Sequence, residues 1–257
     1  MQAINIWNKF YLYSEKSKNL KVFFVFFALI MVSVQGFSQD FKTINLPNSD
    51  ERRLHYGFLI GLHTSGYQTK YAPAFVRDSV RYMGSVLNMD SVTAIEGKYK
   101  PGFSLGFILN VKLTDYVDFR FLPQVAFYEH EVVYSYQNEE PNSQLLEATQ
   151  VEFPLMLRYK SERRGNTRMY LIGGINPSFE AKGKNNEEGE EKLSLKDTNL
   201  AVEFGFGIDI YYPFFKFSPE IRFSKGISNL RDSNNSYSLG LERVSINTVT
   251  LFLQFSD

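Results

Sequence analysis

The sequence contains no cysteine, and this absence excludes disulfide bonds and thiolate metal sites. Histidine is also scarce, with three copies in 257 residues, at His55, His63 and His130. These histidines are scattered, and none has a serine or an acid at a spacing that specifies a catalytic triad. We therefore expect a protein that is not an enzyme and that has no catalytic residues, no cofactor and no metal.

Long apolar runs are absent as well. The most apolar segment, Val22–Val34, has 13 residues and is too short to span a bilayer comfortably. Four lysines precede it, and Gly36 and Ser38 stand at the −3 and −1 positions if cleavage follows Ser38. This arrangement predicts a secretory signal peptide over residues 1–38, with an uncleaved membrane anchor as the alternative.

Charge of one sign is not in excess. The whole chain has a net charge of 0, and residues 1–38 hold four Lys and one Glu, so the mature chain carries 0 − 3 = −3. A weakly acidic exported protein is not suited to binding nucleic acid, and we expect no nucleic-acid partner.

Aromatic residues are abundant, with 24 Phe and 16 Tyr, and they recur with a period of two. In the stretch 200–226, bulky apolar residues alternate with small or charged ones on both sides of the turn Tyr212–Phe214. This alternation predicts a β-hairpin with one apolar face and one polar face. Such a division is typical of barrels with lipid outside and polar side chains inside.

The same alternation predicts eight strands, at 54–63, 99–113, 117–127, 150–159, 169–180, 200–211, 215–226 and 244–255. The connections alternate between long and short, and the long first connection, 64–98, is expected to be a loop with a short helix near 76–87. Tyr134–Gln144 and the charged segment Lys182–Lys192 are predicted to be loops too. Barrels of the bacterial outer membrane have this asymmetry, with tight turns on the periplasmic side.

The fold class predicted is therefore all-β, an eight-stranded antiparallel transmembrane β-barrel after a cleaved signal peptide. The expected organisation is a signal peptide at 1–38, a periplasmic N-terminal lead at 39–53 and an outer-membrane β-barrel at 54–257. Aromatic residues near the short turns are expected to form an interfacial girdle. They are Tyr116, Tyr159, Tyr170, Tyr212 and Phe214.

Five of the nine prolines fall inside predicted strands, where each removes a backbone hydrogen-bond donor. They are Pro101, Pro123, Pro154, Pro177 and Pro219. We expect bulges or locally opened pairing at several of them.

The two faces of the strands define two candidate sites. An eight-stranded barrel is only wide enough for its own side chains, so inward charges are expected to pair in a plugged lumen. This structural charge network comprises Arg120, Glu152, Arg158, Glu203, Asp209, Glu220 and Arg222, with Asp118 and Lys216 on the same face. The expected lipid- or partner-facing wall comprises Phe204, Phe206, Phe215, Phe217 and Phe223.

Several segments resemble the PorT family of Bacteroidota. They are Asn45–Asn48 (NLPN), Glu152–Leu155 (EFPL) continuing to Arg158–Lys160, Tyr170–Gly174 (YLIGG) and, above all, Phe204–Asp209 (FGFGID) through Tyr212–Glu220 (YPFFKFSPE). The resemblance covers roughly residues 45–255. It implies an outer-membrane barrel needed for type IX protein secretion, with gliding motility linked to it in some members, and it implies no catalytic residues.

From the pattern and the resemblance together we expect an outer-membrane protein that acts through protein–protein contacts. Its expected partners are other secretion-system membrane proteins and outer-membrane lipid. Two alternatives remain open: a lipid-modifying membrane enzyme, in which His63 would pair with a loop serine, and a structural or adhesion barrel.

Overall fold

The computed structural model describes residues 44–73, 92–136, 140–181, 195–231 and 241–257. The predicted signal peptide, the expected helix near 76–87 and the charged segment 182–192 lie outside these residues. Within the described ranges, no helix is both long and apolar enough to cross a membrane. A short 3₁₀ helix, η2 (Pro47–Asp50), precedes the strands.

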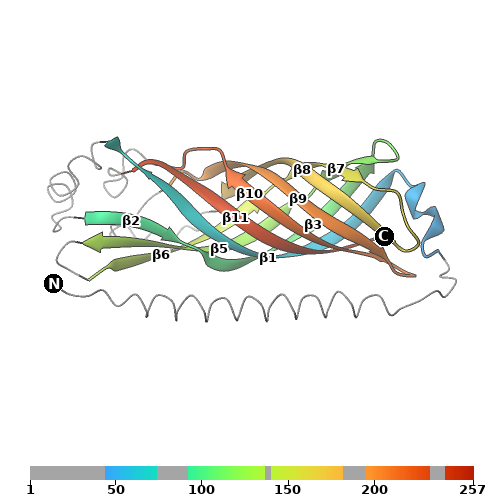
Figure 1. The fold of residues 1–257 in the computed structure, drawn as a ribbon, viewed down its shortest axis with the longest axis horizontal. Coiled ribbons are helices and arrows are strands. Elements are labelled where there is room, and N and C mark those ends of the chain that lie inside the picture. The colour runs from blue at the N-terminus through green and yellow to red at the C-terminus, as the bar shows by residue number, and fades with distance from the viewer. Residues whose placement is uncertain (1–43, 74–91, 137–139, 182–194, 232–240) are drawn as a thin grey trace, which may run out of the picture. The chain divides into compact units, whose positions relative to one another are not determined.

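The described strands form one antiparallel ring (Figure 1). They are β1 (Leu54–Tyr71), β2 (Val92–Lys98), β3 (Lys100–Lys112), β4 (Val117–Phe121), β5 (Gln124–Tyr136), β6 (Asn142–Glu152), β7 (Leu155–Lys160), β8 (Thr167–Glu180), β9 (Thr198–Tyr211), β10 (Lys216–Gly226) and β11 (Leu241–Ser256). Pairing of β1 with both β11 and β3, and of β8 with β9, closes the ring. The predicted all-β, antiparallel fold is confirmed.

Eleven strands make eight passages around the ring, because three passages are interrupted. β2 runs into β3 through Tyr99, β4 into β5 through Leu122 and Pro123, and β6 into β7 through Phe153 and Pro154. The other five passages are β1, β8, β9, β10 and β11. The interruptions therefore divide passages without adding a strand to the ring.

Prolines open the ladder without inserting residues. The β3 register is the same on both sides of Pro123, since Leu109 faces Phe121 and Phe103 faces Phe127. Backbone N–H groups from neighbouring passages donate to the proline carbonyls, from Phe107 to Pro123 at 2.9 Å and from Leu122 to Pro154 at 3.1 Å. Opened pairing is thus found at these breaks, whereas no bulge forms there.

The remaining three strand prolines behave differently from one another. Pro101 and Pro177 stay within the ladder, opposite Thr64 and Leu200. The pairing of β10 with β9 lapses at Ser218 and Pro219 and then resumes in the same register.

Several passages are longer than the sequence predicts. β1 continues to Tyr71, the expected loop 64–98 contains β2, and the expected loop 134–144 is strand up to Tyr136 and again from Asn142. Eighteen residues of β1, at ~3.3 Å each and a tilt of ~40°, rise ~45 Å, against an apolar band of ~25 Å. The strands therefore continue past the apolar band at the end with long connections.

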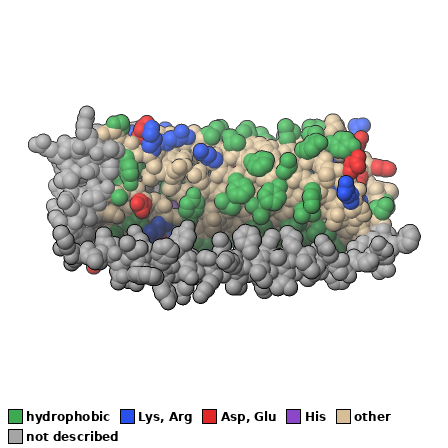
Figure 2. All heavy atoms as spheres, in the orientation of Figure 1, with side chains coloured by type: hydrophobic (Ala, Val, Ile, Leu, Met, Phe, Trp, Pro, Cys, Tyr) green, Lys and Arg blue, Asp and Glu red, His purple; other side chains and the backbone are tan. Residues whose placement is uncertain are grey.

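The two faces of each strand differ in burial as the alternation predicts. On β9 the inward residues from Ala201 to Tyr211 are buried, and the outward Val202, Phe204, Phe206 and Ile208 are exposed. Figure 2 shows hydrophobic side chains spread over the outer surface that faces the viewer. Among the described residues, the buried ones include more polar and charged side chains than hydrophobic ones.

Two apolar clusters lie within the ring. One sits among the central charges and contains Leu59, Ile108, Leu122, Met156, Tyr170, Ile172 and Phe252. The other lies towards the long connections and includes Tyr67, Ile95, Tyr134, Leu230 and Leu241. Together with the polar residues between them, these clusters occupy the part of the lumen that the described residues enclose.

Candidate functional site

All seven residues predicted for the lumen network are buried inside the ring. Among the described residues, ten side chains of the Lys, Arg, Asp and Glu types are buried. Five are acidic and five are basic, so their formal charges cancel. The acids are Asp118, Glu152, Glu203, Asp209 and Glu220, and the bases are Arg120, Arg158, Lys160, Lys216 and Arg222.

The central part of the network is organised by Arg222 and Glu220, both on β10. Arg222 donates from Nε to Glu220 at 2.9 Å and from Nη1 to Glu203 at 3.1 Å. Glu220 also lies 3.6 Å from Arg120 and accepts a hydrogen bond from the Tyr170 hydroxyl at 2.8 Å. Two carboxylates and two guanidinium groups therefore satisfy one another across three passages of the ring.

A second group of charges lies nearer the short turns. Arg158 pairs with Asp209 and lies 3.9 Å from Asp118, which in turn is 2.7 Å from Lys160. The Ser218 hydroxyl donates to Asp209 at 2.6 Å. These contacts join β4, β7, β9 and β10 at their short-turn ends.

Glu152, towards the long connections, is held by neutral donors. Tyr128 donates to it at 2.6 Å and Asn176 at 2.9 Å, and Gln124 donates as well. Asn176 also donates to Glu203 at 2.9 Å and so links Glu152 to the central group. Glu152 therefore belongs to the same hydrogen-bonded group as Glu203, Glu220 and Arg222.

Tyr170 corrects the predicted girdle. Its side chain is 3% exposed and lies inside the lumen, with the Arg158 guanidinium 4.1 Å and that of Arg120 5.5 Å from its ring centroid. A Cβ at Gly207 would lie 2.4 Å from the Tyr170 ring, so only glycine leaves room for this ring. The other predicted girdle residues, Tyr116, Tyr159, Tyr212 and Phe214, are exposed.

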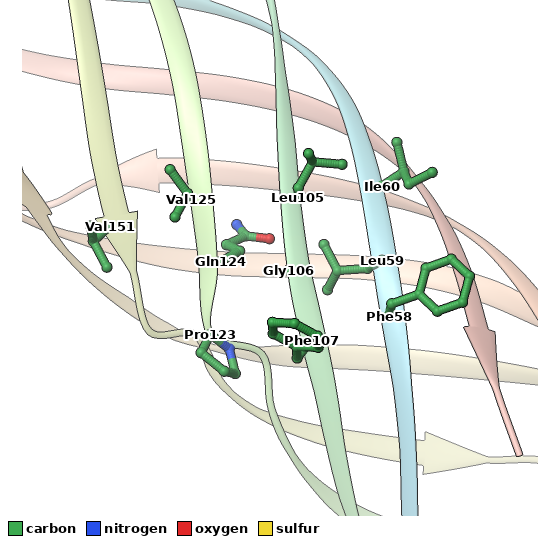
Figure 3. A pocket seen from close by; sticks show the side chains of 10 residues that line it. All are labelled: Phe58, Leu59, Ile60, Leu105, Gly106, Phe107, Pro123, Gln124, Val125 and Val151. Atoms are coloured by element: carbon green, nitrogen blue, oxygen red, sulfur yellow. The ribbon is translucent and has the colours of Figure 1, made fainter.

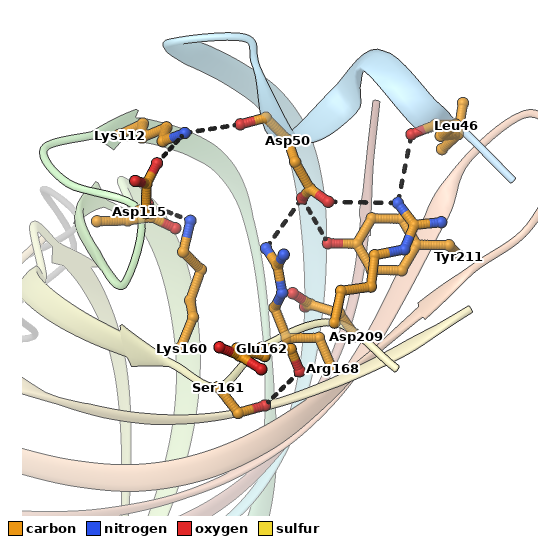
Figure 4. Close-up of polar contacts among 12 residues, drawn as sticks. Leu46, Asp50, Lys112, Asp115, Lys160, Ser161, Glu162, Arg168, Asp209 and Tyr211 are labelled. Atoms are coloured by element: carbon orange, nitrogen blue, oxygen red, sulfur yellow. Dashed lines mark hydrogen bonds and ion pairs between the residues drawn. The ribbon is translucent and has the colours of Figure 1, made fainter. Parts of the chain in front are cut away.

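The N-terminal lead covers the short-turn end of the lumen (Figure 4), a feature that the sequence did not predict. The Asp50 carboxylate of η2 accepts hydrogen bonds from Arg168 at 2.9 Å, Tyr211 at 3.3 Å and Arg163 at 3.4 Å. Lys112 donates to the Asp50 carbonyl at 2.9 Å. We call the space beneath η2 the short-turn mouth; it is lined by Ser49, Asp50, His55, Asn110, Lys112, Asp118, Arg158, Lys160, Arg168, Tyr211 and Lys216.

The turn beside the mouth carries one further ion pair. Lys112 lies 2.8 Å from Asp115, and this hydrogen-bonded ammonium group lowers the pKa of the Asp115 carboxyl. Lys112 thus links the β3–β4 turn to the lead.

Within the described residues, no histidine has the serine and acid partners that an esterase triad needs. His63 is buried, and its ring centroid lies 4.4 Å from that of Tyr128. The serine contact belongs instead to His130, whose Nδ1 is 3.5 Å from Ser65 Oγ, and both residues are fully buried. His130 Nε2 has no hydrogen-bond partner among the described residues. Those residues also contain no cluster of three or more metal-ligating side chains of the His, Cys, Asp or Glu type.

The predicted wall lies on the outer surface of β9 and β10. Phe204, Phe206, Phe215 and Phe223 are 40–55% exposed, and Phe217 is partly exposed, with its ring 5.1 Å from that of Phe255. The aromatic surface therefore continues from β10 onto β11.

A groove of about 470 Å³ lies elsewhere on the outer surface, where β1, β3 and β5 adjoin the break at Pro123 (Figure 3). Its lining is almost wholly apolar and includes Phe58, Leu105, Phe107 and Val125. A Cβ at Gly106 would lie 2.5 Å from Gln124 Cβ and 2.6 Å from the Pro123 carbonyl oxygen, so only glycine allows this close approach. The sequence signal for this groove was the proline itself, which marked an opened ladder but not its shape.

Solved structures similar to this chain include OprG from Pseudomonas aeruginosa, with 14% identity, a TM-score of 0.46 and coverage of 80% of this chain and 95% of that chain. Neisserial surface protein A is 11% identical, with a TM-score of 0.38 and coverage of 77% and 95%. The outer membrane protein AlkL is 8% identical, with a TM-score of 0.43 and coverage of 86% and 94%.

No curated protein matches the chain. Residues 37–232 match the family described as outer membrane protein beta-barrel domain. This match spans well over half of the 257 residues. The chain therefore belongs to the outer membrane protein beta-barrel domain family and is a β-barrel protein of the outer membrane.

Proposed function

We propose that this barrel is a non-enzymatic component of the type IX protein secretion apparatus and acts through contacts with other membrane proteins of that machine. The observation that carries the proposal is the contrast between a filled lumen and an aromatic outer wall. The choice of machine rests on the resemblance of Phe204–Asp209 and Tyr212–Glu220 to the PorT family. Gliding motility linked to the same apparatus is part of the proposal.

The filled lumen argues against a role as a pore. Arg120, Glu220 and Arg222 lie across the middle of the ring at 1–2% exposure, packed against the apolar cluster around Phe252. Opening a path there would separate buried ion pairs, and breaking such a pair costs about 3–5 kcal/mol. Function therefore falls to the surfaces that the barrel presents.

The histidines give little support to a lipid-modifying enzyme. Ser65 and His130 are fully buried beneath the apolar cluster that contains Tyr67 and Ile95, so a lipid ester could not reach the hydroxyl. An orienting acid on the second ring nitrogen, which a triad needs, has no counterpart among the described residues.

Deletion of the gene tests the proposal, with a plasmid-borne copy as the complementation control. Cargo proteins with C-terminal sorting domains are expected to accumulate in the periplasm of the deletion strain, and complementation is expected to restore their export. Unchanged secretion with altered lipid A would favour the enzyme, and unchanged secretion with altered surface adhesion would favour the structural barrel.

The wall is tested separately from the fold. Phe204→Leu with Phe206→Leu keeps the outer surface of β9 apolar but removes the aromatic shape that a protein partner would contact. The matched control is Phe58→Leu with Phe107→Leu, on β1 and β3. We expect only the β9 pair to reduce secretion while both barrels assemble. Equal secretion by both variants would refute a partner contact at this wall.

A further inference from the structure

The short-turn mouth contains buried donors that lack acceptors. Lys216 is 5% exposed, and none of the described residues accepts a hydrogen bond from its ammonium group. Arg158, 2% exposed, donates to Asp209 from Nη2, while its Nε and Nη1 have no hydrogen-bond partner. Arg168 Nε likewise has no hydrogen-bond partner among the described residues. Asp118 Oδ1 and His55 Nδ1, which line the same space, also have no hydrogen-bond partner. Most buried polar groups in proteins are hydrogen-bonded, so these unpaired atoms around one space point to a bound species.

The local charge balance gives the sign of that ligand. Near the short turns, three buried bases, Arg158, Lys160 and Lys216, face two buried acids, Asp118 and Asp209. The compensating acid, Glu152, lies in the other half of the lumen, among neutral donors. Asp50 does not supply the missing charge, because its carboxylate is already shared by Arg163 and Arg168.

The cavity sets the size of the ligand. The space among these residues is small, about 10 Å³, and therefore suits a single compact ion better than a polyatomic one. Ser49 and Asp50 of the lead both line it, and Figure 4 shows Asp50 at the side of the lead.

We propose that the short-turn mouth binds one small monovalent anion, chloride being the natural candidate, between the Lys216 ammonium group and the free N–H groups of Arg158. The anion supplies acceptors to both cations and neutralises the surplus positive charge beneath the lead. This makes closure of the mouth by η2 dependent on an ion, independently of any role in secretion.

Crystals of the full mature barrel grown in sodium bromide test the proposal directly, since bromide replaces chloride and scatters anomalously. The expected result is an anomalous peak within contact distance of Lys216 Nζ and Arg158. Density at this position without an anomalous signal would show a water molecule and would overturn the proposal.

Stability in solution gives a second test. The urea midpoint of the wild-type barrel in detergent is expected to be higher in sodium chloride than in sodium gluconate of equal ionic strength. Lys216→Met is expected to abolish this difference, and the matched control Lys225→Met, an exposed lysine on the same strand, is expected to retain it. Equal midpoints of the wild type in the two salts would refute the anion. If Lys216→Met does not fold, the bromide crystals and the wild-type comparison still decide the question.

Discussion

Replacing Arg222 by Met should destabilise the barrel strongly. Arg222 is 2% exposed and is the cation nearest to both Glu220 and Glu203. Its removal leaves Glu203 with Asn176 as its hydrogen-bond donor and Glu220 with a more distant guanidinium at 3.6 Å. Removing one partner of a buried pair typically costs about 3–5 kcal/mol, and the lost stacking on the Phe252 ring adds about 0.5–2 kcal/mol.

A second variant separates charge from packing. Glu203→Gln in the Arg222→Met background removes the uncompensated carboxylate and keeps its shape, so the double variant should be at least about 1 kcal/mol more stable than Arg222→Met alone. Simple loss of packing predicts no such recovery.

The assay is urea unfolding and refolding of the mature barrel in detergent, followed by far-UV circular dichroism and by heat-modifiable gel migration. Tryptophan fluorescence is unsuitable, because the single tryptophan, Trp7, lies in the predicted signal peptide. A stability of Arg222→Met within about 1 kcal/mol of the wild type would refute the reasoning, as would a double variant no more stable than the single one.

Three further changes have defined outcomes. Gly207→Ala should lower the free energy of unfolding by about 1–3 kcal/mol, because the new Cβ would lie 2.4 Å from the Tyr170 ring. Gly173→Ala, whose Cβ would have its nearest neighbour at 3.6 Å, should be nearly neutral. Equal urea midpoints for the two variants would disprove the clash. Asp50→Asn should speed proteolysis of the lead, with a loss of only about 1 kcal/mol for this partly exposed site, and a cleavage rate equal to the wild type would show that Asp50 does not hold η2. Phe223→Asp should reduce assembly in bilayers, since a charge on the lipid face at mid-depth costs about 2–4 kcal/mol for a basic residue and less for an acidic one. Phe223→Leu should assemble normally, and heat-modifiable migration measures both.

The sequence predicted the strands best where one face meets lipid. Along 200–226 the alternation of bulky and small or charged residues gave the face of every residue from Val202 to Ile208 as the structure has it. The lumen residues followed from the same parity, because a period of two assigns each side chain to one face. The pairing among the charges could not be predicted, since it depends on which passages adjoin.

The rest of the fold lacked such a signal. Residues 64–71 of β1 leave the apolar band, so polar residues occupy both faces and the segment is indistinguishable from a loop. Tyr170 stands near a strand end, as a girdle residue would, and only its parity with the buried Ile172 indicated the lumen. The lead has no periodicity, and the role of Asp50 depends on Arg163 and Arg168, more than a hundred residues away.

The strand prolines have a consequence for the chain before it folds. An exported barrel crosses the periplasm with its apolar strands unpaired, and such segments readily stack edge to edge into aggregates. A proline cannot donate to a growing cross-β ladder, and Pro101, Pro123, Pro154, Pro177 and Pro219 place one such position in each of five passages. The finished barrel accommodates three of the missing donors by opening its ladder locally at Pro123, Pro154 and Pro219. The same residues thus lower the tendency of the transported chain to precipitate and leave the register of the assembled wall unchanged.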